Sequence, residues 1–100
     1  MAYNLPQATY DETYDLQKFI FPFSLTGAEV EMRVYKSNSK LPLETYTTSD
    51  NLEIDTENDK ILNIKEHIIT IEPGIYNYKI RVTIEGKRRT YLTGNWSIVD

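Results

Sequence analysis

The stretch GIYNYKIRVTIEGKRRTYLTGNWSIVD, residues 74–100, decides the fold. Apolar and polar side chains alternate strictly in its first half, which is the pattern of a strand with one buried and one exposed face. The residues of the apolar face are Tyr76, Tyr78, Ile80, Val82 and Ile84. The segment Glu85-Gly86-Lys87 that follows is typical of a tight hairpin turn. The stretch therefore predicts two long antiparallel strands that lie side by side.

The second strand of this hairpin keeps the alternation, with Leu92, Trp96 and Ile98 on its apolar face. Because Trp96 belongs to this face, we expect it in the core rather than on a ligand-binding surface. Gly94 falls on the same face. Its missing side chain is interpreted in one of two ways: it makes room for a ring of the facing sheet, or it marks a β-bulge.

Segments upstream of this hairpin show the same period of two. A half-buried strand is predicted from the alternating residues Ala28, Val30, Met32 and Val34. Residues 16–24 place three phenylalanines on one face, and Pro22 lacks a backbone donor, which confines this strand to a sheet edge or to a bulge. Shorter strands are predicted near 43–48, 51–55 and 61–64. Residues 65–69 fit either a one-turn helix or a strand.

Residues that favour strands, namely Val, Ile, Thr, Tyr, Phe and Trp, far outnumber Ala, Leu and Met. About seven short strands with frequent turn signals are typical of an immunoglobulin-like antiparallel β-sandwich. We therefore expect an all-β chain with a single sandwich domain at residues 16–100. A flattened β-barrel is the alternative.

Residues 1–15 show no sustained period and are predicted to form an extended N-terminal arm. Three aromatic residues lie on it, Tyr3, Tyr10 and Tyr14. Because such rings gain nothing from lying in water, the arm either wraps its own sheet or docks on a neighbouring subunit. If it docks on a neighbour, a chain without residues 1–14 should remain a folded monomer that no longer assembles.

Composition excludes several classes of function. The chain of 100 residues has no cysteine and one histidine, so disulfides and the usual structural zinc sites are not expected. A net charge of −4 argues against binding to nucleic acid through the phosphate backbone. No apolar run is long enough to cross a bilayer, and the N-terminus lacks the features of a signal peptide. No membrane contact and no export are therefore expected.

The residues that could carry chemistry do not form a recognisable site. Asp55, Glu57, Asp59 and Glu66 approach the spacing of a calcium loop, but Lys60 occupies the position where the loop needs glycine. His67 has no partner that would complete a catalytic triad. We predict no catalytic, cofactor-binding or metal-binding residue, and hence no enzyme.

Two segments carry a resemblance to a known class of proteins. They are SLTGAEVEMRVYKS at 24–37 and PGIYNYKIRVTIEGKRRTYLTGNWSIVD at 73–100. Both resemble the small immunoglobulin-like virion proteins of tailed bacteriophages, and in particular the N-terminal domain of their upper baseplate proteins. The matching positions are Leu25, Thr26, Gly27, Ala28, Pro73, Gly74, Tyr76, Tyr78, Gly86, Leu92, Gly94, Trp96 and Ile98.

The resemblance implies a non-enzymatic structural part of a phage particle that contacts other virion proteins and copies of itself. Its location is left open among tail, baseplate, neck, head fibre and capsid surface. The candidate assembly residues are Tyr3, Tyr10 and Tyr14 on the arm and Arg88 and Arg89 at the hairpin tip.

The alternative is a carbohydrate-binding module that recognises host surface glycans. On the predicted strands, Tyr35 and Tyr91 are the rings that would face solvent and stack on a sugar.

Overall fold

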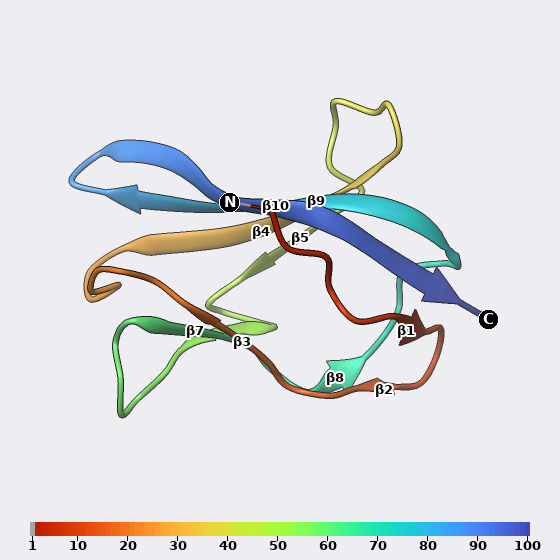
Figure 1. Cartoon of the computed structure of the whole chain (residues 1–100), viewed down its shortest axis with the longest axis horizontal. Coiled ribbons are helices and arrows are strands. Elements are labelled where there is room, and N and C mark those ends of the chain that lie inside the picture. Colours follow the sequence, from red (N-terminus) through yellow and green to blue (C-terminus); the bar gives the residue numbers. More distant parts are fainter. Residues whose placement is uncertain (1) are drawn as a thin grey trace.

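A computed structural model describes residues 2–100, which form ten β-strands and no helix (Figure 1). The prediction of an all-β chain is thereby confirmed for this part of the chain. The strands are β1 (Ala8–Thr9), β2 (Thr13–Tyr14), β3 (Gln17–Ile20), β4 (Glu29–Lys36), β5 (Glu44–Thr47), β6 (Leu52–Ile54), β7 (Ile61–Ile64), β8 (His67–Ile68), β9 (Gly74–Ile84) and β10 (Lys87–Val99). No helix long and apolar enough to span a membrane occurs in residues 2–100.

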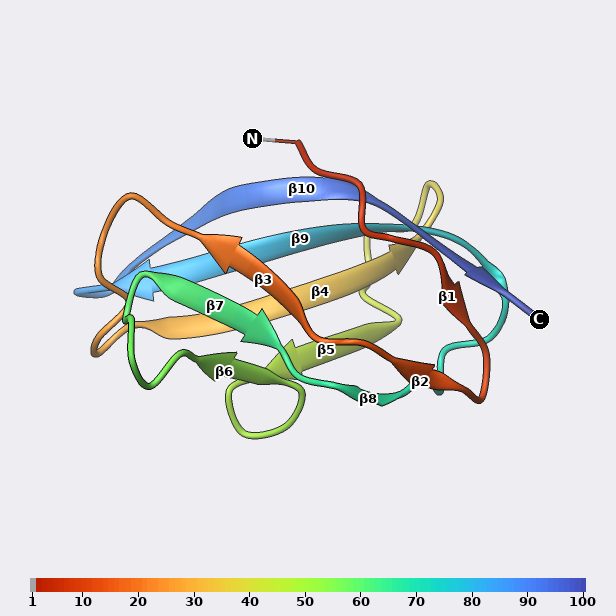
Figure 2. The same cartoon turned by 60° about the horizontal axis from the view of Figure 1, so that its bottom comes forward.

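The strands lie in two layers (Figures 1 and 2). One layer is a mixed sheet in the order β1-β10-β9-β4-β5, in which β1 runs parallel to β10 and the other neighbours are antiparallel. The opposite layer contains the antiparallel sheet β3-β7-β6, and the short pair β2-β8 continues it along the chain. Residues 65–69, which fit a helix or a strand, contain strand β8.

The apolar faces meet between the two layers as the alternation predicts. Val30, Met32 and Val34 of β4 are buried, and so are the inward residues of β9 from Tyr76 to Val82. Trp96 is fully buried, with its ring centroid 5.3 Å from that of Tyr14. Burial of these aliphatic and aromatic side chains supplies the main favourable free energy of folding.

The turn between β9 and β10 has a simple stereochemical basis. Glu85 and Gly86 both have positive φ, 52° and 78° respectively. A two-residue hairpin loop with positive φ at both positions matches the right-handed twist of the flanking strands. The predicted hairpin turn therefore consists of Glu85 and Gly86, and β10 begins at Lys87.

The structure separates the two interpretations of Gly94. The bulge in β10 lies at Tyr91, where the register with β9 shifts between Thr90 and Leu92. A Cβ atom on Gly94 would lie 1.8 Å from the carbonyl oxygen of Tyr3. Gly94 therefore does not mark the bulge. Its missing side chain leaves room for the backbone of Tyr3 and also for the ring of Tyr78 in the neighbouring strand β9, whose Cε1 would lie 2.9 Å from the added Cβ.

The N-terminal segment wraps its own sheet. Leu5, Ala8 and Tyr14 are buried in the core, and Tyr3 and Leu5 donate their N–H groups to the carbonyl oxygens of residues 93 and 95 of β10, at 2.8 and 3.0 Å. Residues 2–15 therefore pack as part of the same fold as residues 16–100. A chain without residues 1–14 would lose core side chains, so we now expect it to be destabilised rather than to remain a folded monomer.

Candidate functional site

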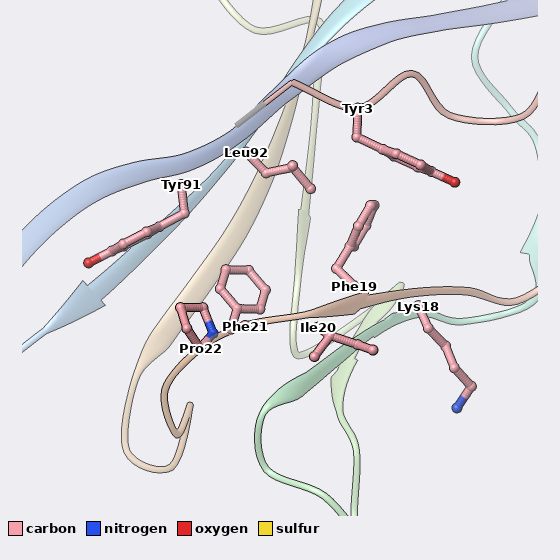
Figure 3. A pocket seen from close by; sticks show the side chains of 8 residues that line it. All are labelled: Tyr3, Lys18, Phe19, Ile20, Phe21, Pro22, Tyr91 and Leu92. Carbon is pink, nitrogen blue, oxygen red and sulfur yellow. The ribbon is translucent and has the colours of Figure 1, made fainter.

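An apolar groove runs between β3 and β10 on one side of the molecule (Figure 3). Its volume is about 410 Å³. The residues that line it are Tyr3, Lys18, Phe19, Ile20, Phe21, Pro22, Tyr91 and Leu92. The groove therefore brings together the N-terminal segment, an edge of each layer and the bulge of β10.

Aromatic rings form the walls of the groove. Phe19 of β3 and Phe21, which follows this strand, point toward Leu92 of β10 (Figure 3). Lys18 and Ile20 border the groove, but the ends of their side chains point away from it. Tyr3 contacts Phe19 edge to face, with ring centroids 5.8 Å apart and planes at 87°. These rings are held in place by their own packing, so the groove is a preformed surface.

The opposite end of the groove is closed by a second aromatic group. Tyr91 packs against Phe21 and Phe23, with ring centroids 6.2 and 5.0 Å apart. Phe21 and Phe23 in turn lie 5.6 Å apart. The bulge at Tyr91 places this ring toward β3, although strict alternation from Leu92 predicts that it faces solvent.

β3 is an edge strand, as Pro22 predicts. Phe21 donates its N–H to the carbonyl oxygen of Lys60 at 2.8 Å, beside the register pair Ile20–Ile61. Since hydrogen-bonding pairs alternate along an antiparallel ladder, Phe19 also faces β7, whereas Lys18 and Ile20 direct their backbone N–H and C=O groups away from it. This free edge forms one lip of the groove.

The facing lip belongs to β10. β1 pairs with this strand at Ile98 and Val99, and Ala2 forms an isolated bridge to Thr93. Within residues 2–100, no strand pairs with the side of β10 that lies between the hairpin and Thr93. The groove therefore lies between the edges of two different sheets.

Positive charge lies at both ends of the groove. Lys18 is half-exposed and makes an ion pair of 3.8 Å with Asp55. At the other end, β10 leads into the hairpin tip, where Lys87, Arg88 and Arg89 are exposed. Among residues 2–100, none of these three hairpin residues lies within 4.0 Å of a carboxylate oxygen.

The five residues predicted for assembly do not form one surface. Tyr3, 46% exposed, lines the groove, whereas Tyr10, 38% exposed, donates its N–H to Val99 near the C-terminus. Arg88 and Arg89 are exposed at the hairpin tip, as expected. The prediction that Tyr14 buries its ring against a neighbour is corrected, because that ring lies in the core of its own chain.

Tyr14 has a structural role. Its hydroxyl donates a hydrogen bond to the carbonyl oxygen of Pro6 at 2.7 Å. Burial raises the pKa of the Tyr14 hydroxyl to about 12, because the ionised form would lose hydration. This contact joins Pro6 to β2, two parts of the same N-terminal segment.

The acidic residues at 50–59 organise turns. Asp55 accepts hydrogen bonds from the side-chain amide of Asn63 and from the backbone N–H groups of residues 57 and 58, which lowers its pKa. The hydroxyls of Ser24 and Thr26 donate to Asp59 and lower its pKa in the same way. No group of three or more His, Cys, Asp or Glu residues that could hold a metal ion occurs within residues 2–100.

His67 is part of an internal hydrogen-bond chain. Its Nδ1 lies 2.6 Å from the carbonyl oxygen of Lys65, and its Nε2 lies 3.1 Å from the hydroxyl of Tyr46. Because a carbonyl oxygen can only accept, Nδ1 donates to Lys65, and Nε2 shares a hydrogen bond with the hydroxyl of Tyr46. This arrangement positions β8 against the core.

The two rings expected to face solvent do not form an exposed aromatic platform. Tyr35 is 9% exposed, and the ammonium group of Lys79 lies 5.6 Å from its ring centroid. Tyr91 is half-buried in the aromatic group that closes the groove. The stacking surface that glycan recognition requires is therefore absent at these two residues.

Sequence reasoning missed the groove itself. The sequence pattern places Phe19, Phe21 and Leu92 on the apolar faces of two strands and assigns Ile20 no role. Pro22 is the available signal, since it marks an edge strand.

No protein-family model matches the chain, and no curated protein is significantly similar to it.

Proposed function

We propose that this chain is a non-enzymatic structural component of a tailed bacteriophage virion and that it acts by binding other proteins. The observation that carries the proposal is the groove between β3 and β10. Preformed apolar grooves bordered by charged residues are typical of surfaces that bind other molecules. For such a contact the groove provides the arm residue Tyr3 at one end and the ring of Tyr91 at the other.

The strand order supports an immunoglobulin-like assignment. The order β10-β9-β4-β5 corresponds to strands G, F, C and C′ of an immunoglobulin variable-type sheet, and β3-β7-β6 corresponds to B, E and D. The parallel pairing of β1 with β10 fits an N-terminal strand beside strand G. We therefore assign the fold to the immunoglobulin-like sandwiches rather than to a flattened barrel.

The residues that carry the resemblance to phage proteins occupy structurally demanding positions. Gly27 and Gly86 have positive φ in turns, Trp96 is fully buried, and Gly94 contacts the N-terminal segment. This agreement supports the resemblance, because each such position restricts the residue type. The partners would be other virion proteins and copies of this chain.

The proposal is tested on particles of the phage that encodes the chain. Virions are purified by density-gradient centrifugation, and fractions are analysed by quantitative mass spectrometry and by immunogold electron microscopy with an antibody to this chain. We expect the chain to band with the major capsid protein in a constant ratio and the gold label to mark one part of the particle.

A phage-encoded enzyme of the lysate serves as the control that should stay out of the particle fractions. If this chain remains with that enzyme in the particle-free fractions, the proposed function is wrong.

A further inference from the structure

We propose that the groove binds an extended segment of a partner protein, which adds to the free edge of β3 as a further antiparallel or parallel strand. The segment carries apolar side chains at every second position and acidic residues at its ends. This inference rests on the proposed function, since it specifies how the chain contacts another virion protein.

The backbone of β3 supplies the hydrogen bonds. Lys18 and Ile20 direct N–H and C=O groups away from β7, so an added strand would find a donor and an acceptor at each. Pro22 has no N–H and ends this free edge. Strand addition to an exposed sheet edge is a common way for a domain to bind an extended peptide.

The groove supplies the apolar complement. In an added strand, side chains alternate between the two faces of the sheet, so every second one would enter the space between β3 and β10. That space is lined by Phe19, Phe21 and Leu92, which are 7%, 5% and 6% exposed (Figure 3). Because these side chains are already almost fully buried, a strand placed there would gain free energy mainly by burying its own apolar side chains.

Geometry favours a partner segment over a second copy of this chain. If β3 paired with β3 of a second copy about a two-fold axis, Lys18 of one chain would face Ile20 of the other and the axis would pass at Phe19. The two grooves would then join, with no side chain of either β3 to fill them. A separate extended segment fills the groove, whereas a second β3 does not.

Charge complementarity specifies the ends of the segment. Lys18 lies at one end of the groove, and the exposed side chains of Lys87, Arg88 and Arg89 lie beyond the other. The side chain of Lys18 points away from the groove, and its ammonium group lies 3.8 Å from Asp55, so it can also contact a carboxylate on the same face of the added strand. The chain as a whole has a net charge of −4, so the cations near the two ends of the groove are a local feature.

The test uses a synthetic peptide as the probe. It has about seven residues, alternating valine and threonine, with an aspartate at each end and a fluorophore at its N-terminus. Fluorescence anisotropy measures its affinity for the full chain, and amide hydrogen exchange measures protection of individual N–H groups. We expect saturable binding and slower exchange at the N–H groups of Lys18 and Ile20.

Two substitutions at one position form the matched test. Ile20→Pro removes the N–H that faces away from β7 and leaves the ladder to β7 intact, so it should weaken binding about tenfold or more. Ile20→Ala truncates the same side chain but keeps that N–H, so it is the reference against which the weaker binding of Ile20→Pro is measured. Circular dichroism of both variants verifies that they are folded.

The charged ends are tested by combining Arg88→Glu with Arg89→Glu. We expect this change to weaken binding about threefold at low salt and to have little effect at high salt, where screening removes the attraction.

Three results would overturn the inference: equal affinity of the Ile20→Pro and Ile20→Ala variants, concentration-dependent dimers that Ile20→Pro abolishes, or binding of host polysaccharide that protects no N–H of β3. If these occur while the chain still bands with virions, the proposed function stands and this inference alone fails.

Discussion

Substitution of Gly94 by alanine tests the packing of the N-terminal segment most directly. The new Cβ would lie 1.8 Å from the carbonyl oxygen of Tyr3, and an ordinary contact needs at least 3.4 Å. The carbonyl group must therefore move by about 1.6 Å. Because the obstructing atom belongs to the backbone, a change of side-chain rotamer cannot relieve the clash.

The cost follows from the hydrogen bonds that this movement breaks. Tyr3 donates to Thr93 at 2.8 Å, Leu5 donates to Asn95 at 3.0 Å, and the buried hydroxyl of Tyr78 donates to the carbonyl oxygen of Tyr3. At about 1 kcal/mol for each bond, the variant should lose about 3 kcal/mol of unfolding free energy. For a domain of this size, that loss lowers Tm by on the order of 15 °C.

Urea unfolding followed by the fluorescence of Trp96, the chain's single tryptophan, measures this difference. The Ser97→Ala variant, in the same strand, is the control and should change stability by less than about 0.5 kcal/mol. In a chain without residues 2–4, most of the effect of Gly94→Ala should disappear, because the obstructing carbonyl group is absent. A Gly94→Ala variant as stable as the unmodified chain would refute the placement of Tyr3 against β10.

Three further predictions concern single side chains. Asp59 has a lowered pKa in the folded chain, so its stabilising effect is present above its unfolded pKa near 3.8 and is lost as the pH falls through its folded pKa. Asp59→Asn should therefore flatten the decline of the urea midpoint between about pH 5 and pH 2. Glu57→Gln, the control, should not. Tyr14 has a raised pKa in the folded chain, so its contribution to stability is complete below about pH 10 and is lost toward about pH 12. Tyr14→Phe should cost about 1 kcal/mol at neutral pH, because the hydrogen bond to Pro6 is lost, and it should reduce the loss of stability at alkaline pH. An unchanged loss of stability at alkaline pH would be the contrary result. Glu85→Asn should raise Tm by a few degrees, because asparagine tolerates the positive φ of 52° better than glutamate does, and a lowered Tm would contradict this turn assignment.

Local pattern predicted the strands because burial on one face of a sheet imposes a period of two on each strand separately. The inward faces of β4 and β9, the hairpin at Gly86 and the core position of Trp96 all follow from this rule. Pro22 indicated an edge strand because a missing N–H is incompatible with a central position. None of these conclusions requires knowledge of which strands become neighbours.

The position of the N-terminal segment could not be obtained in this way. Residues 1–15 have no period, and the contacts that hold the segment join Tyr3 to Tyr78 and Gly94, far along the chain. The assignment of Tyr14 to an assembly surface was wrong for the same reason, since burial of an isolated ring depends on what packs over it.

By itself, the sequence determined an all-β chain, the buried face of each long strand, the hairpin turn and the edge character of β3, because each depends on residues close together in the chain. Only the tertiary structure decided that the N-terminal segment covers β10, that the bulge turns Tyr91 toward Phe21, and that the free edges of β3 and β10 enclose an apolar groove. The physical reason is that β3 and β10 belong to different sheets, and the space between two sheets is set by the packing of every strand in both layers.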